Sequence, residues 1–303
     1  MHIIMEYGSY YNELEREKWD FAFRGIELDQ RDITAIEALN SCVSKSFTIV
    51  YQPNESSLKV NDEISVGVDD IEDFLKDKGI SENSKIILEC TSLGFAEMLV
   101  LMQAIKNIGC NAIDALYLAP KHYTRLGPGI FNRRNFDLTT SFAGFKAIPG
   151  QGLAYNYGDK AIVLCGYEAE RLSRAFDETE LQGNDCQLIF GVPPYVVGWD
   201  MNSYANYLSV IDSNNISKEN YYCGAANPLS VYQKIEKVYK GLEDEQKLFV
   251  LPFGTKPMAL GACAFIVEHN WENKLSILFD HPQKKKGRST DYGKWNLYRI
   301  KYG

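Results

Sequence analysis

The chain has 303 residues, of which 45% are hydrophobic and 24% are charged, and this composition is that of an ordinary globular protein rather than a disordered one. Its formal net charge of −8 gives no support to a broad nucleic-acid-binding surface. The amino-terminal segment becomes charged too early for a signal peptide, and no apolar run approaches the ~20 residues that a membrane helix needs. We therefore expect a cytoplasmic protein that has no membrane partner and does not bind nucleic acid directly.

Seven cysteines are scattered along the chain, and several of them lie within apolar runs. No CxxC pair occurs, and no histidine has the spacing from them that a zinc site requires. This pattern is typical of buried, reduced thiols. We expect neither a structural metal nor a bound cofactor.

The first 45 residues are expected to form a mainly helical segment. Residues 12–23 are charged with embedded aromatic side chains, and residues 29–42 carry apolar side chains at helical spacing. From residue 46 to residue 119 the pattern alternates instead. Strands are expected at 46–53, 85–91 and 112–120, and helices at 68–79 and 96–109.

Residues 120–160 are rich in proline and glycine. They are predicted to form a long excursion with little regular structure, and such loops are often functional. The alternative is a β-hairpin within this stretch, formed by 136–142 and 145–150. Either way, the stretch interrupts the alternation of strands and helices.

The alternation resumes after residue 160. Strands are expected at 161–166, 186–194, 220–225, 247–252, 274–282 and 295–301, and helices at 167–178, 202–211, 227–241 and 255–269. In the helix at 167–178, Arg171 and Arg174 are expected to pair with the flanking carboxylates Glu168, Glu170 and Asp177.

This alternation predicts βαβ units and hence an α/β fold. We expect a Rossmann-like, mainly parallel sheet with helices on both faces, either as one continuous sheet or as two Rossmann-like halves. The expected divisions are the helical segment at 1–45, a first α/β half at 46–160 that includes the loop at 120–160, and a second α/β half at 161–303.

In open parallel sheets, ligands bind beyond the carboxyl ends of the strands. The strand at 247–252 runs into Gly254, Thr255 and Lys256, where a helix begins. Gly254 allows a tight turn, Thr255 can cap the helix or offer its hydroxyl to a ligand, and Lys256 lies at a helix N-terminus that favours anions. The alternative is an ordinary capped helix start with a solvated lysine. Neither a Walker A loop nor a GxGxxG motif occurs in the sequence.

The turn at 254–258, after a hydrophobic strand and before a helix of small residues, resembles the G-G-T-K-x-M turn of CARF-like domains. Those domains are Rossmann-like sensors of cyclic oligonucleotides or related nucleotides in prokaryotic antiviral systems. The resemblance implies that Thr255 and Lys256 contact a ligand. Phe253 departs from the family, which often has glycine at that position, and this departure could narrow the backbone approach to a ligand.

The turn after the strand at 85–91 is a second candidate. It contains Thr91, Ser92 and Gly94. The CARF-like resemblance implies a ligand contact from small or hydroxyl residues at such a position, and these three residues fit that description.

Asp280 and His281 follow another predicted strand and form a possible acid–base pair by residue type. The basic run at 284–288 could bind phosphates or be a solvated loop. No nucleophile motif or histidine-rich metal motif accompanies them. We include Asp280 and His281 among the expected ligand-binding residues and assign no catalytic residue.

These observations lead us to expect a CARF-like sensor of a nucleotide or another anionic small ligand, which signals through a protein partner or another copy of itself. Two alternatives stay open. One is an enzyme that acts on a nucleotide or phosphorylated substrate with Lys256, Asp280 and His281. The other is a non-catalytic scaffold subunit of a larger assembly.

Overall fold

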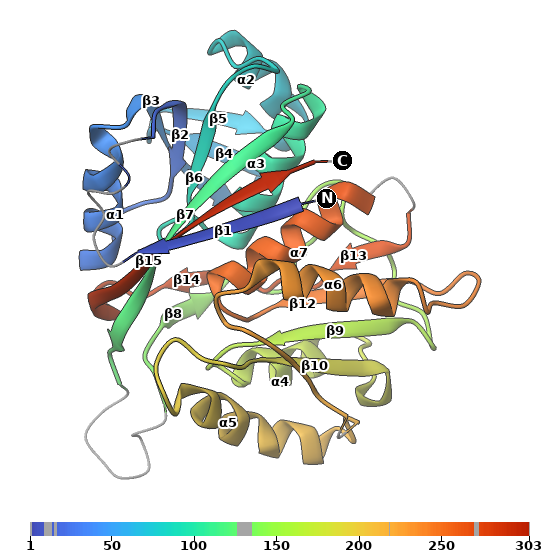
Figure 1. Ribbon diagram of the computed structural model, residues 1–303. Coiled ribbons are helices and arrows are strands. Elements are labelled where there is room, and N and C mark those ends of the chain that lie inside the picture. The colour runs from blue at the N-terminus through green and yellow to red at the C-terminus, as the bar shows by residue number, and fades with distance from the viewer. Residues whose placement is uncertain are drawn as a thin grey trace. The chain divides into compact units, whose positions relative to one another are not determined.

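The computed structural model describes residues 2–8, 14, 17–125, 135–217, 219–269 and 273–302. These residues form two compact units (Figure 1). Unit 1 comprises Met1–Tyr123 and Lys285–Gly303, and unit 2 comprises Thr124–Lys284. Among the described residues, no helix combines the length and the apolar character that a membrane span requires. Part of the predicted excursion at 120–160, residues 126–134, lies outside the described residues.

Unit 2 is built on a sheet that contains five strands in the described part of the chain, in the order β11-β10-β9-β12-β13. Every pair of neighbours in this sheet is parallel. The strands are β9 (Lys160–Cys165), β10 (Cys186–Gly191), β11 (Tyr221–Cys223), β12 (Leu248–Pro252) and β13 (Leu275–Ile277). The central strands β9 and β12 are almost entirely buried, as expected for apolar strands that are covered on both faces.

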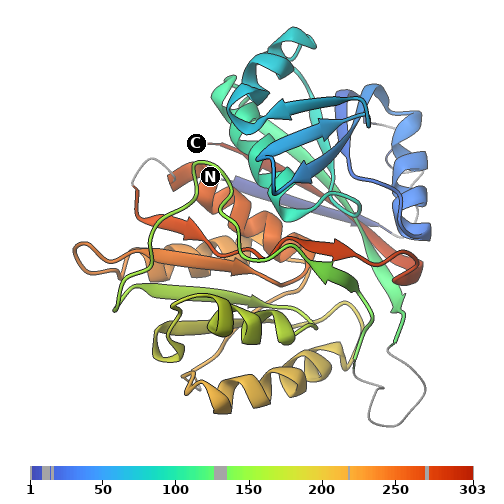
Figure 2. The same cartoon turned by 180° about the vertical axis from the view of Figure 1, so that it is seen from behind.

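Four helices cover the faces of this sheet in the described residues: α4 (Glu170–Glu178), α5 (Trp199–Ser213), α6 (Pro228–Tyr239) and α7 (Lys256–His269). Figures 1 and 2 show α4 and α5 on one face and α6 and α7 on the other. The rings of Tyr232 in α6 and Phe265 in α7 pack edge to face at 5.2 Å. The start of α6 is as predicted, because the Asn227 side chain accepts a hydrogen bond from the Ser230 amide and Pro228 is the first residue of the helix.

The strand order of unit 2 reverses between β9 and β12. The chain leaves β9 through α4 to β10, and it leaves β12 through α7 to β13, which lies on the opposite side. The carboxyl ends of these two neighbouring strands therefore form a topological switch point, where open parallel sheets bind ligands.

Unit 1 contains a mixed sheet with eight strands among the described residues, in the order β1-β15-β7-β6-β2-β3-β4-β5. The four strands β7, β6, β2 and β3 are parallel, and the flanking strands are antiparallel. The strands are β1 (His2–Gly8), β2 (Trp19–Arg24), β3 (Val43–Gln52), β4 (Ser57–Val60), β5 (Ile64–Gly67), β6 (Ile86–Glu89), β7 (Ala112–Tyr123) and β15 (Ser289–Lys301).

The helices of unit 1 are α1 (Gln30–Asn40), α2 (Ile71–Asp77), which follows the short helix η2 (Val68–Asp70), and α3 (Phe95–Asn107). The chain leaves β2 through α1 to β3 and leaves β6 through α3 to β7, in opposite directions across the sheet. Because such crossovers are right-handed, α1 and α3 cover opposite faces. Unit 1 therefore has a switch point of its own, between β2 and β6.

The α/β prediction is confirmed, and most of the predicted strands and helices occur. The mainly helical interpretation of residues 1–45 is wrong, because this segment contains β1 and β2 ahead of α1. Trp19, Phe21 and Phe23 belong to the buried strand β2. The charges that precede them favoured a helical interpretation, but aromatic residues fit a buried strand better.

The sequence interpretation also missed short antiparallel pairings. β4 and β5 form a hairpin whose turn residues Asn61 and Asp62 have positive φ (Figure 2). β8 (Thr139–Phe142) pairs with β14 (Pro282–Lys284), so the alternative of a hairpin between 136–142 and 145–150 is not observed. A short helix, η4 (Gly183–Asp185), precedes β10. The strands lie in two main sheets, so the alternative of one continuous sheet is not observed.

Candidate functional site

The turns after β9 and β12 touch at the switch point of unit 2. A Cβ atom on Gly166 would lie 2.1 Å from the carbonyl oxygen of Phe253, so only glycine permits this approach. A Cβ on Gly254 would lie 3.1 Å from Leu164 and from the sulfur of Met258. The two glycines therefore bring the backbone of both turns together at the edge of the sheet.

Thr255 caps α7 and ties it to the neighbouring loop. Its hydroxyl donates a hydrogen bond to the Ala225 carbonyl at 2.6 Å and accepts one from the Met258 amide at 3.4 Å. The capping role is therefore the one that the geometry shows. Because Ala225 follows β11, this hydroxyl also holds the loop after β11 against the start of α7.

Lys256 is the first residue of α7 and is partly exposed. In the described part of the chain, the amides of Gly254 and Thr255 donate no hydrogen bond. Both residues are half-buried, and a helix N-terminus concentrates partial positive charge at such amides. The turn therefore presents two backbone donors and the helix dipole to an anion, and Lys256 adds positive charge beside them.

Phe253 does not obstruct this turn. Its side chain is only 4% exposed and belongs to the core of unit 2. The guanidinium carbon of Arg171 lies 4.3 Å from the centre of its ring. The residue that departs from the CARF-like pattern thus fills the interior behind the turn.

Asp280 and His281 have separate partners. The carboxylate of Asp280 is completely buried and accepts hydrogen bonds from Arg171 on both oxygens. The Nε2 atom of His281 lies 2.9 Å from the Lys146 carbonyl, and its ring packs against Phe279 at 4.9 Å. Each side chain therefore has a structural role, and the contacts do not direct the two side chains at a common atom.

Thr91 and Ser92 lie in unit 1, where an internal carboxylate occupies the switch point. Glu89 accepts hydrogen bonds from the Thr91 amide at 2.8 Å, the Ser92 amide at 2.9 Å and the Ser92 hydroxyl. The Ser92 hydroxyl also accepts from the Gly25 amide, and the Thr91 hydroxyl accepts from the Leu118 amide. Thr91 and Ser92 are 0% and 2% exposed.

Gly94 is the N-cap of α3 and lies against a second carboxylate. A Cβ on Gly94 would be 2.1 Å from an oxygen of Glu97. Burial raises the pKa of Glu89, while hydrogen bonds from Ser92 and Thr91 oppose that rise. The edge of unit 1 therefore already holds carboxylates where unit 2 presents amide donors and Lys256, and an external anion is better accommodated in unit 2.

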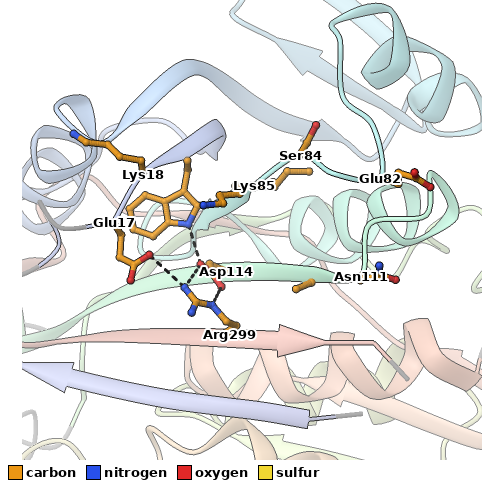
Figure 3. Close-up of a pocket in the computed structure, with 11 residues that line it drawn as sticks. Glu17, Lys18, Glu82, Ser84, Lys85, Asn111, Asp114 and Arg299 are labelled. Atoms are coloured by element: carbon orange, nitrogen blue, oxygen red, sulfur yellow. Dashed lines mark hydrogen bonds and ion pairs between the residues drawn. The ribbon is translucent and has the colours of Figure 1, made fainter.

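A cavity of about 320 Å³ lies at the amino ends of β2, β6 and β7 in unit 1 (Figure 3). Asp114 accepts hydrogen bonds there from the Trp19 indole at 2.9 Å and from Arg299 at 2.9 and 3.0 Å. Arg299 also pairs with Glu17 at 3.5 Å, and its hydrogen bond to Asp114 raises its pKa. These charges compensate one another, and the cavity lies at the sheet edge where ligands are not expected.

Sequence reasoning missed the close backbone contact at Gly166 and the distant partner of Arg171. Arg174 pairs within its own helix, although with Glu178 and not with one of the three expected carboxylates. Arg171 pairs instead with Asp280, which lies 109 residues further along the chain. The one sequence signal for the contact between Gly166 and the Phe253 backbone is the position of this glycine directly after a buried strand. Within the described residues, no cluster of His, Cys, Asp or Glu could hold a metal ion, and none of the cysteines forms a disulfide.

No protein-family model matches the chain, and no curated protein matches it.

Proposed function

We propose that unit 2 is a Rossmann-like ligand-binding unit that senses an anionic small molecule of the phosphorylated or nucleotide-like class. The observation that carries this proposal is the turn at 254–256, where two amides without an intramolecular acceptor in the described chain stand beside Lys256 at a helix N-terminus. This combination suits a phosphate oxygen, because backbone amides and an ammonium group all donate to it.

The nucleotide-like class rests on the resemblance of the turn to CARF-like domains, and a role in prokaryotic antiviral defence is proposed on the same ground. Unit 1 has a comparable strand reversal, and we propose that it is a second Rossmann-like half. Its switch point is occupied by Glu89, so we assign the ligand to unit 2.

A sensor fits the site better than an enzyme. General acid–base catalysis needs a base within reach of the reacting atom, and a hydrolase also needs an activated nucleophile or a metal-bound water. Asp280 is neutralised by a buried arginine, and His281 is directed at a backbone carbonyl. We therefore propose that the ligand is bound and released unchanged and that a partner reads its presence.

The test is to release small molecules from the purified protein, identify them by mass spectrometry, and titrate the protein with a panel of cyclic and linear nucleotides. We expect Lys256→Ala to weaken binding of the best panel member by about 1–3 kcal/mol, the scale of a lost charge-assisted hydrogen bond. The melting temperature should change little, because Lys256 lies at the surface of the turn. Lys237→Ala, at an exposed position on α6, is the matched control and should bind normally.

Equal affinity of the parent and Lys256→Ala would refute the assignment of the site. Conversion of any panel member to product by the parent would refute the sensor and favour the enzyme.

A further inference from the structure

Apolar side chains are exposed along the outer surface of α5 in unit 2. Val197, just before the helix, is 98% exposed, Met201 is 66% exposed and Leu208 is 43% exposed. Single exposed apolar residues are common, but a row of them on one element marks an interaction surface.

The row follows the helical repeat. Trp199, Ser203, Tyr207 and Ile211 are the buried residues of α5, and their four-residue spacing places them on the face towards the sheet. Met201 and Leu208 are separated by seven residues and lie on the opposite face, together with Ala205, and the exposed Val197 precedes the helix. α5 thus carries two apolar faces, although a surface helix normally carries one.

The edge strand β11 extends this surface. Tyr222 is 56% exposed, and its ring packs at 6.5 Å from Phe190. Phe190 in turn contacts Tyr204 and Tyr207 of α5 at 5.3 and 5.7 Å. The exposed aromatic ring therefore lies on the side of the sheet that α5 covers.

The charges on α5 indicate what kind of partner fits. The helix contains Asp200 and Asp212 and no lysine or arginine. A second copy of the chain would bring the same two carboxylates to a symmetric contact, and the whole chain carries a net charge of −8. A partner with basic residues beside an apolar row would gain both the apolar burial and the charge complementarity.

We propose that the outer face of α5, with Tyr222, is the docking surface for a basic amphipathic helix of another protein. Such a helix would place its apolar side chains over Met201 and Leu208 and its lysine or arginine residues beside Asp200 and Asp212.

The inner face of the same helix holds the turn that follows β9. The Ser203 hydroxyl donates to the Gly166 carbonyl, and the Asn206 amide group donates to the Tyr167 carbonyl at 3.0 Å. The Trp199 ring packs against the Tyr167 ring at 5.7 Å. A ligand at the switch point and a partner on α5 would therefore act on one helix. That consequence rests on the proposed function, whereas the docking surface does not.

The test uses a displayed library of helical peptides of about 15 residues, or four turns. Leucines occupy one face at four-three spacing, and the flanking positions vary among lysine, glutamate and serine. We expect the protein to enrich peptides with lysine flanks. Their dissociation constants should rise at least about tenfold for the variant that combines Met201→Asp and Leu208→Asp, because the new carboxylates interrupt the apolar row.

The control is Ile64→Asp, since Ile64 is 46% exposed in the β4–β5 hairpin of unit 1 and should not affect binding. Because both positions on α5 are exposed, the double variant should melt as the parent does. No enrichment, enrichment of glutamate-flanked peptides, or equal binding by the double variant would each overturn the proposal. Two other results would do so by identifying a different occupant: a parent dimer that the double variant dissociates, or binding to anionic phospholipid vesicles that the double variant loses.

Discussion

Arg171, in the first turn of α4, binds both carboxylate oxygens of Asp280, which follows β13, with its Nε atom at 3.2 and 3.0 Å. The two residues are 6% and 0% exposed. The guanidinium also stacks on Phe253, directly before the candidate ligand turn. One buried ion pair thus joins the segments that follow β9, β12 and β13.

The ion pair predicts a large loss of stability for Asp280→Asn. The change leaves a buried guanidinium without its counter-charge, which costs about 3–5 kcal/mol. Urea unfolding followed by circular dichroism would measure the loss. The double variant Arg171→Met with Asp280→Leu should lose much less, because neither charge remains. A loss below about 1 kcal/mol for Asp280→Asn would show that water reaches the pair.

Gly166→Ala tests the contact between the two turns of unit 2. The new methyl group would meet the Phe253 carbonyl oxygen at 2.1 Å, so one turn has to move. We expect a loss of about 1–3 kcal/mol in unfolding free energy, the usual cost of overpacking, together with weaker ligand binding. Gly241→Ala, whose Cβ would make ordinary contacts at 3.4 and 3.6 Å, is the control and should retain ligand affinity. Normal affinity in Gly166→Ala would show that the close approach is not needed.

Glu89 predicts a pH dependence with a definite sign. Burial raises its pKa in the folded state above the ordinary value of 4.5, which applies to the unfolded state. Between pH 4.5 and the pKa of the folded state, the folded state therefore binds more protons than the unfolded state. The stability contributed by Glu89 is therefore greatest below pH 4.5 and is lost as the pH rises through the folded pKa. Glu89→Gln should be less stable than the parent at low pH, and this difference should shrink towards neutral pH.

The stability that Asp29 contributes changes with pH in the opposite direction, and it does so at lower pH than the contribution of Glu89. Burial opposes its ionisation, but Arg31, Ser289 and Arg288 together hold its pKa below the ordinary value of 3.8. Above pH 4.5 the ionisation of Asp29 therefore contributes little to the change of stability with pH. Unfolding curves of the parent and Glu89→Gln in that range measure the contribution of Glu89. Parallel stability profiles of the two proteins would contradict the prediction.

Arg299 forms ion pairs with two carboxylates, the buried Asp114 and the exposed Glu17, so the contributions of the two pairs to stability can be compared. Asp114 is 7% exposed and accepts from both Arg299 and Trp19, whereas the Glu17 side chain is 45% exposed. We expect Asp114→Asn to cost about 1–3 kcal/mol, because a buried donor loses its acceptor, and Glu17→Gln to cost at most about 0.5 kcal/mol. Similar losses in thermal unfolding would show that solvent screens both pairs equally.

Local sequence patterns predicted the elements whose residues are close together in the chain. The apolar runs of β6, β9 and β12 and the Asn227-Pro228 start of α6 have their signals within a few residues. The aromatic strand β2 was misassigned because the charged residues before it matched a helical pattern. The β4–β5 hairpin was missed although Asn61 and Asp62 are turn residues.

The hydrogen bonds and ion pairs that hold the candidate site together join residues far apart in the chain, so local sequence patterns do not predict them. The partners Arg171 and Asp280 lie far apart in the chain. From residue type alone, Arg171 was expected to pair within its helix, and Asp280 was considered for an acid–base role. Thr255 was correctly placed at a helix start, but its bond to Ala225 requires the order of the strands. Glu89 is the last residue of β6, and nothing in its own segment indicates that the two residues after it enclose its carboxylate.

β15 lies between β1 and β7, and it pairs with both along most of its length. The sheet of unit 1 therefore cannot be completed on the ribosome until residues 289–301 have been synthesised, whereas unit 2 is one continuous stretch of the chain. Unit 2 can fold while unit 1 still exposes the edge of β7 to other chains or chaperones. The order of synthesis thus favours a folding sequence in which unit 2 forms first and the larger sheet of unit 1 closes afterwards.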